Sequence, residues 1–234
     1  MFVFSPKTNF TRLQLALFAG GRSALLHELA ARMGAKNPHQ FAVCFDNNFG
    51  MLTQQSGKWR ANFGGAKPLS AQQRKLLARL DTDADVLHDD GPAALWKAMW
   101  GQLNELQSIV SVELEKWLTL DMVLAEFEAD LLLAELERAP LSLANLATAV
   151  ALYRLHLEVE AIVPLGLDGK GICRCLRLCL DNDQIQQELS RLGVQHAVDS
   201  ELTSWIVSRP DLEVAWASSR TRWNVLAERL DWVS

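Results

Sequence analysis

The sequence predicts a mainly α-helical protein in which a small N-terminal α+β segment, containing a short β-meander, precedes a multi-helix bundle. After residue 93, apolar residues recur every three or four positions, which is the period of an amphipathic helix. Between residues 40 and 63, short apolar runs alternate with Asn, Ser and Gly, which is typical of strands joined by turns. We therefore expect a basic α+β segment over residues 1–68 and an acidic bundle of about six to eight helices over residues 69–234, as two domains or as one continuous domain.

The elements of the first segment are predicted from its turn and cap residues. Arg22–Met33 has the spacing of a helix, and Gly34 ends it. The strand candidates of the meander are Gln40–Phe45, Met51–Gln54 and Lys58–Phe63, and Met1–Phe4 is a further short strand candidate. Asn47 and Gly50 supply the first turn signal of this meander.

The bundle is predicted from caps and apolar periodicity. Ser70 is expected to cap a helix over Ala71–Leu80, and Asp81–Pro92 is expected to be an acidic loop. The later helices are expected from Ala93 to near Pro140 with a break at Thr119–Asp121, from Ser142 to about Val163, over Ile172–Leu192 with a break at Asp181–Asp183, over Glu201–Val207 and over Leu212–Trp232.

Composition indicates a folded, soluble protein. Of the 234 residues, 49% are hydrophobic and 22% are charged, so the chain has enough apolar surface to bury and is not of the disordered class. No stretch has the pattern of a signal peptide or the roughly 20 apolar residues of a membrane span. Four cysteines in a chain of this length are too few for a disulfide framework. We expect a cytoplasmic protein with no membrane contact.

Charge is divided unevenly along the chain. Residues 1–80 contain 11 Lys or Arg and two acidic residues, a net charge of +9, whereas residues 81–234 have a net charge of −14. A bias of this size indicates a charged partner. The alternative is that the basic segment packs against the acidic helices of the same chain.

The basic segment also holds eight of the nine Phe residues. Positive charge, aromatic rings and short strands together can bind single-stranded nucleic acid by phosphate contact and base stacking. The candidate nucleic-acid-binding residues are Lys58, Trp59, Arg60 and Lys67. In the alternative interpretation, the aromatic residues of this segment are core.

The C-terminal part is rich in tryptophan, which often anchors protein interfaces. The candidate partner-binding residues are Trp205, Trp216, Trp223 and Trp232.

No motif for catalysis, a cofactor or a metal is complete. Cys173, Cys175 and Cys179 form C-x-C-x3-C, which lacks the paired C-x2-C arms of a zinc site. Asp81, Asp83 and the residues that follow lack the glycine and the final glutamate of a calcium loop. We therefore predict no catalytic residue, no cofactor and no metal ligand, and three buried thiols in a helix.

These observations favour a non-catalytic protein-interaction subunit, or an inhibitor-like binder of another protein, for which a protein partner is expected. A toxin-neutralising or secretion-accessory role fits this character. The alternative is a nucleic-acid-binding subunit of a larger complex that uses the basic, aromatic N-terminal segment. A third hypothesis is an enzyme whose site is assembled from distant positions.

Overall fold

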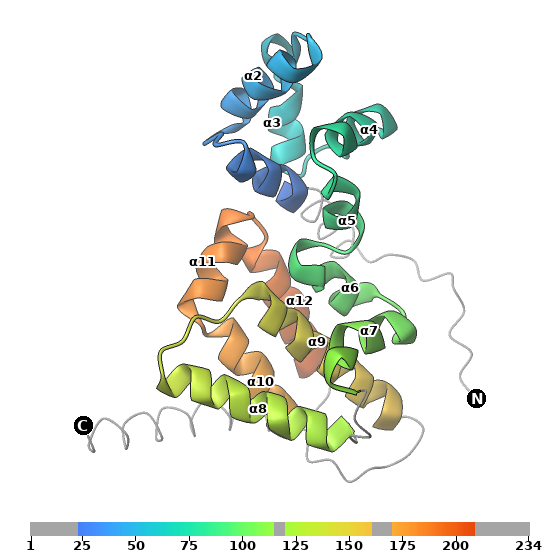
Figure 1. The fold of residues 1–234 in the computed structure, drawn as a ribbon, viewed down its shortest axis with the longest axis vertical. Coiled ribbons are helices and arrows are strands. Elements are labelled where there is room, and N and C mark those ends of the chain that lie inside the picture. Colours follow the sequence, from blue (N-terminus) through green and yellow to red (C-terminus); the bar gives the residue numbers. More distant parts are fainter. Residues whose placement is uncertain (1–22, 115–119, 161–169, 209–234) are drawn as a thin grey trace. The chain divides into compact units, whose positions relative to one another are not determined.

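A computed structural model of the protein describes residues 23–114, 120–160 and 170–208 (Figure 1). Helices make up most of these residues and no strand occurs among them, so the predicted mainly α fold is confirmed. After the helical residues 23–32, the elements are α2 (Pro38–Phe49), the 3-10 helix η1 (Thr53–Ser56), α3 (Lys58–Phe63), α4 (Ala71–Leu80), α5 (Ala84–Asp89), the 3-10 helix η2 (Pro92–Ala94), α6 (Leu95–Trp100), α7 (Leu103–Leu114), α8 (Leu120–Leu136), α9 (Leu143–Glu160), α10 (Lys170–Leu180), α11 (Asp183–Arg191) and α12 (Gln195–Val207).

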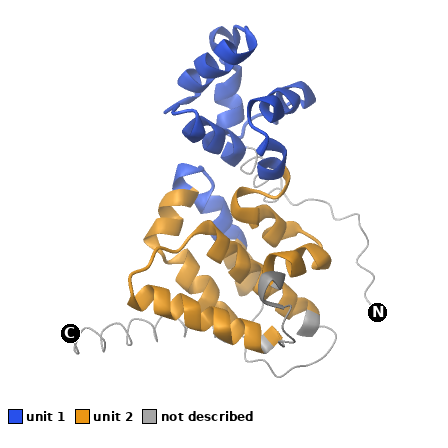
Figure 2. Ribbon diagram, in the orientation of Figure 1, with its two compact units in different colours: residues 1–88, 190–201 blue, residues 89–189, 202–234 orange. Residues whose placement is uncertain are grey.

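The chain forms two compact units (Figure 2). Unit 1 contains residues 1–88 and 190–201, and unit 2 contains residues 89–189 and 202–234. The boundary at residue 68, which was predicted from composition, stays a prediction.

The predicted β-meander is wrong. Its strand candidates Gln40–Phe45, Met51–Gln54 and Lys58–Phe63 lie in or beside α2, η1 and α3. The fourth strand candidate, Met1–Phe4, lies outside the described residues.

Local cap chemistry explains why α2 is a helix. The Asn37 side chain accepts a hydrogen bond of 2.9 Å from the Gln40 backbone N–H, and Pro38 occupies the first helical position. Gly50 ends the helix in the left-handed conformation, with φ of 63°. Gly50, which also resembles a hairpin turn residue in sequence, is therefore the C-cap of a helix.

Aromatic residues at helical spacing form the core of unit 1. Phe41 and Phe45 lie one turn apart on α2, and both pack against Trp59, with ring centroids 5.1 and 4.8 Å away. Phe41 also contacts Phe63, which lies one turn after Trp59 on α3. Leu26 and other residues of the preceding helix join this cluster. A single buried side of each short helix thus accounts for the apolar runs that resembled strands.

Other predicted elements match the structure closely. α4 has the predicted bounds and the predicted Ser70 cap, which is part of a complete capping box with Gln73. The predicted break at Asp181–Asp183 separates α10 from α11. The acidic segment Asp81–Pro92 is not all loop, because it contains α5.

Unit 2 is organised around α9. This helix packs against α6, α7 and α10, and α10 also packs against α8. Leu146, Val150 and Leu152 of α9 are all buried, so the helix is apolar on more than one side, as a central helix must be. Among the helices in the described ranges, none has both the length and the hydropathy that a membrane span requires.

Gly91 lies at a turn of unit 2 where an added side chain would collide with a buried tryptophan. A Cβ at this position would lie 2.3 Å from Cγ of Trp96, and the backbone φ is +79°. We expect Gly91→Ala to lower the free energy of unfolding by about 3 kcal/mol, because it combines overpacking with the strain of a φ/ψ region that essentially only glycine adopts.

Gly50→Ala is the matched control, because Gly50 has φ of +63° and open space within 4 Å of its added Cβ. Urea denaturation followed by circular dichroism should show a smaller loss for this control, about 1 kcal/mol. Equal losses for the two variants would contradict the predicted collision.

Candidate functional site

Unit 1 contains a stretch of chain with positive charge and no negative charge. Between Asp46 and Asp81 the sequence has no acidic residue and six basic ones. All six side chains are exposed and form no ion pair with any residue that the structure describes. Five of them also have no described aromatic ring beneath them, and we call these five the cationic group: Lys58, Arg60, Lys67, Arg74 and Lys75. The sixth, Arg79, lies over the ring of Phe49, 5.5 Å from its centroid.

Two acidic residues of unit 1, Glu28 and Asp81, are already engaged by arginine side chains. Glu28 accepts hydrogen bonds from Arg32 and Arg191, at 3.3 and 2.7 Å. Burial alone would raise the pKa of Glu28, but these two guanidinium groups outweigh that effect and lower the pKa. Asp81 receives a hydrogen bond of 2.9 Å from Arg32. These carboxylates are therefore not the counter-charges of the cationic group.

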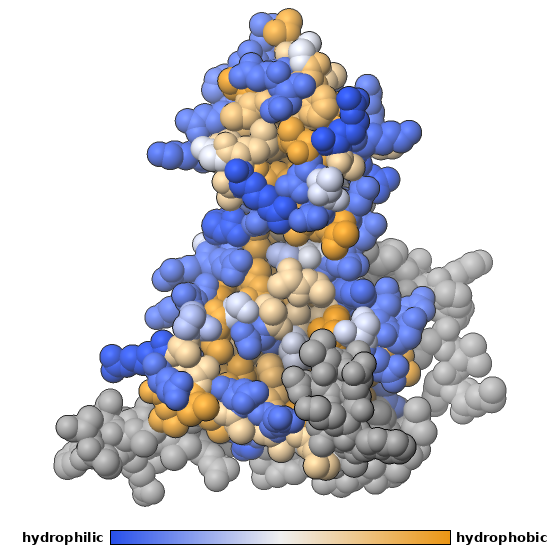
Figure 3. All heavy atoms as spheres, viewed as in Figure 1, coloured by the Kyte–Doolittle hydropathy of each residue, from blue (hydrophilic) through white to orange (hydrophobic). Residues whose placement is uncertain are grey.

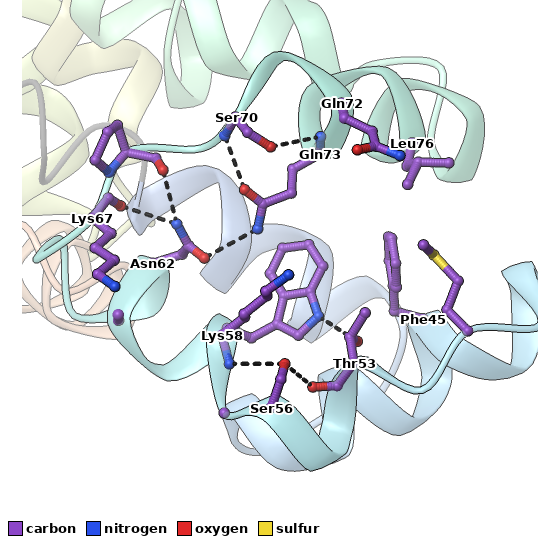
Figure 4. Close-up of a pocket in the computed structure, with 15 residues that line it drawn as sticks. Phe45, Thr53, Ser56, Lys58, Asn62, Lys67, Ser70, Gln72, Gln73 and Leu76 are labelled. Atoms are coloured by element: carbon purple, nitrogen blue, oxygen red, sulfur yellow. Dashed lines mark hydrogen bonds between the residues drawn. The ribbon is translucent and has the colours of Figure 1, made fainter.

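A cavity of about 440 Å³ lies between α3 and α4 (Figure 4). Its polar lining residues are Thr53, Ser56, Lys58, Asn62, Lys67, Ser70, Gln72 and Gln73. Its apolar lining residues include Phe45, Met51, Trp59 and Leu76. Figure 4 shows Phe45 and Leu76 at one end, Lys67 and Asn62 at the other, and Lys58 between them. The cavity is thus apolar at one end and cationic at the other.

One wall of the cavity is fixed by the buried amide of Asn62. This amide nitrogen donates to the carbonyl oxygens of Lys67 and Pro68, at 3.0 and 3.1 Å. Its oxygen accepts a hydrogen bond of 3.1 Å from the Gln73 amide, which in turn accepts from the backbone N–H of Ser70. The loop that carries Lys67 is therefore held against the start of α4 by a satisfied polar network.

The opposite wall is fixed by a chain of hydrogen bonds from α3 to α2. The Trp59 indole N–H donates to the Thr53 hydroxyl at 2.8 Å, and this hydroxyl donates to the Asp46 carboxylate at 2.6 Å. The backbone N–H of Gln54 donates to the other carboxylate oxygen at 2.9 Å. Burial alone would raise the pKa of Asp46, but the bonds from Thr53 and Gln54 lower it below its ordinary value.

The predicted nucleic-acid-binding residues are brought together only in part. Lys58, Trp59 and Lys67 line the same cavity, whereas Arg60 is exposed and does not line it. Trp59 is 2% exposed, and its N–H is used inside the protein, so its ring is part of the core in this structure. Asn62, Gln72 and Gln73 were not predicted; they lie in the acid-free stretch, but no sequence spacing singles them out.

The predicted partner-binding tryptophans fall mostly outside the described residues, because Trp216, Trp223 and Trp232 lie beyond residue 208. Trp205 is half-buried on α12 and stacks on Tyr153, with the rings 11° from parallel. It lines a second cavity of about 310 Å³ in unit 2, with Tyr153, Arg154, Leu157 and Ser208.

The three clustered cysteines are buried on α10, as predicted. Burial raises the pKa of Cys175 well above its ordinary value and that of Cys179 to about 12, so both side chains are protonated thiols near neutral pH. Within the described ranges, no three His, Cys, Asp or Glu residues are grouped as metal ligands would be.

Apolar side chains lie between hydrophilic ones on the face of unit 1 drawn in Figure 3. An arrangement of this kind suits binding, because apolar surface supplies affinity and the surrounding charges supply orientation.

No protein-family model, curated protein or solved structure matches this chain.

Asp46 should make the stability of unit 1 depend on pH. Its folded-state pKa is lowered, so its contribution is fully present above the ordinary pKa of about 4 and is lost as the pH falls through the folded value. We expect Asp46→Asn to lower the free energy of unfolding by about 2 kcal/mol at pH 7, with a smaller difference from the native chain at lower pH.

Urea denaturation of both chains between pH 7 and pH 2 measures this difference. Asp85→Asn is the control, because Asp85 is exposed and its carboxylate has no hydrogen bond to a described residue. Its effect should stay below about 0.5 kcal/mol at every pH. If the free energies of unfolding of Asp46→Asn and the native chain differed by the same amount from pH 7 to pH 2, the proposed contribution of the Asp46 carboxylate would be wrong.

The thiols should differ in reactivity. We expect iodoacetamide at pH 8 to modify the half-buried Cys44 in the native protein while Cys175 and Cys179 stay unmodified. Peptide mass spectrometry reads out each site, and a sample in denaturant shows that all of them can react. Native-state modification of Cys179 at the rate of Cys44 would contradict this prediction.

Proposed function

We propose that this protein is a protein-interaction subunit that binds an acidic partner through the cationic group of unit 1. The observation that carries the proposal is the set of five exposed cations, which have no ion pair among the described residues and come from an acid-free stretch of chain. Cations in such an arrangement attract acidic surfaces, speed the encounter and fix its orientation. An inhibitor-like role agrees with this chemistry, since covering a charged functional surface blocks it.

The cavity supports the same proposal. A cavity of about 440 Å³ is within the size range of ligand sites, and its walls are held in place by the Asn62 network and the Asp46 chain. A preformed cavity lowers the ordering cost of binding.

Nucleic acid is the second candidate partner, because the same cations can neutralise phosphates. Phe41, Phe45 and Trp59 are all buried in the core of unit 1. This burial favours contact with the phosphate backbone over the base stacking that the sequence suggested.

Fluorescence anisotropy of labelled polyanions tests the proposal. The probes are a poly-glutamate peptide, a single-stranded oligonucleotide and a duplex, each titrated at low and moderate salt. We expect poly-glutamate to bind, with an affinity that falls as salt screens the charges. Lys58→Glu, Arg60→Glu and Lys67→Glu should each weaken it by about fivefold or more.

Lys36→Glu is the matched control, because Lys36 is exposed in unit 1 but lies outside the acid-free stretch. It should weaken binding by less than about twofold. Tighter binding of the oligonucleotides than of poly-glutamate, with a steep salt slope, would favour the second candidate. Absence of binding to every probe at low salt would overturn both.

A further inference from the structure

We infer that the cavity between α3 and α4 receives one apolar side chain of an acidic peptide segment, whose flanking carboxylates contact Lys58 and Lys67. This inference rests on the proposed function and names the chemistry that its site recognises.

The two ends of the cavity set the ligand's chemistry. Phe45, Met51 and Leu76 line it with apolar atoms. Leu52, which follows Met51, is 68% exposed, so the apolar surface continues past the cavity wall. An apolar side chain that enters the cavity at this end would lose contact with water and gain contact with carbon atoms, which is favourable.

The polar groups of the cavity divide into those already used and those open to a ligand. The side-chain amides of Asn62 and Gln73 form hydrogen bonds with each other and with the loop before α4. The Ser56 hydroxyl donates to the Thr53 carbonyl. The ammonium groups of Lys58 and Lys67 form no ion pair with a described residue, and the exposed Gln72 amide forms no hydrogen bond with one.

This division favours a peptide over a nucleotide. Recognition of a base requires donors and acceptors aimed at its edge, and the amides best placed for it are committed within the protein. A peptide can satisfy the groups that remain open. Its carboxylates can pair with the two lysines, and a backbone group can hydrogen-bond to the Gln72 amide. The ligand is thus a peptide with one apolar side chain, and the residues on either side of it are acidic.

Three labelled peptides test the inference by fluorescence anisotropy. The first is Glu-Glu-Phe-Glu-Glu, the second replaces its Phe by Ala, and the third replaces its four Glu by Gln. We expect the first peptide to bind. The other two should bind at least about tenfold more weakly, because the second lacks the apolar side chain and the third lacks the carboxylates.

Protein variants locate the contact. Lys58→Glu and Lys67→Glu should each weaken the first peptide about tenfold, whereas Lys75→Glu should weaken it by less than about twofold. Lys75 is the matched control, because it is exposed on α4 and belongs to the cationic group but does not line the cavity. All three side chains are exposed, and thermal melts of the variants serve to check that they remain folded.

The outcomes separate the two proposals. Equal binding of the Phe and Ala peptides, or equal losses in Lys58→Glu and Lys75→Glu, would overturn the cavity and leave a diffuse cationic surface. Binding of poly-glutamate without binding of the first peptide would do the same. Failure of both poly-glutamate and the first peptide to bind would overturn the proposed function as well.

Discussion

The hydrogen bond from the Trp59 indole to the Thr53 hydroxyl is the interaction on which unit 1 depends. It ties α3 to η1, and the same hydroxyl carries the connection on to the Asp46 carboxylate of α2. It also commits the indole to the core beside Phe41 and Phe45. With the aromatic rings turned inward, the basic residues of α3 and α4 are left to form the surface.

This arrangement explains how a basic stretch can be both core and binding surface. α3 is short, and its residues alternate in role: Trp59 and Phe63 are buried, while Lys58 and Arg60 are exposed. Asn62 extends the order into the following loop, because its amide holds two carbonyl groups there. The hydrogen bond from Asn62 thus holds the backbone of Lys67 in place but does not involve its ammonium group, which stays open to a partner.

Local signals in the sequence predicted much of the fold. The Ser70 cap and the Asp181–Asp183 break were predicted because caps depend on a few neighbouring residues. The meander was mispredicted because Gly50 serves hairpin turns and helix ends equally, and a short apolar run suits a buried strand or a helix. Charge pointed to Lys58 and Lys67, but Asn62 and Gln73 matter through a hydrogen bond across eleven positions, which spacing alone does not show.

Nuclear magnetic resonance of the indole N–H groups tests whether an acidic peptide places its apolar side chain in the cavity beside Trp59. Trp59 lines the cavity in unit 1, whereas Trp96 and Trp205 lie in unit 2, and the indole signals are assigned in the isotope-labelled native protein. Titration with the Glu-Glu-Phe-Glu-Glu peptide should shift the Trp59 resonance progressively and leave the Trp96 and Trp205 resonances unchanged. Shifts confined to the tryptophans of unit 2, or saturable binding with no shift at Trp59, would contradict the account.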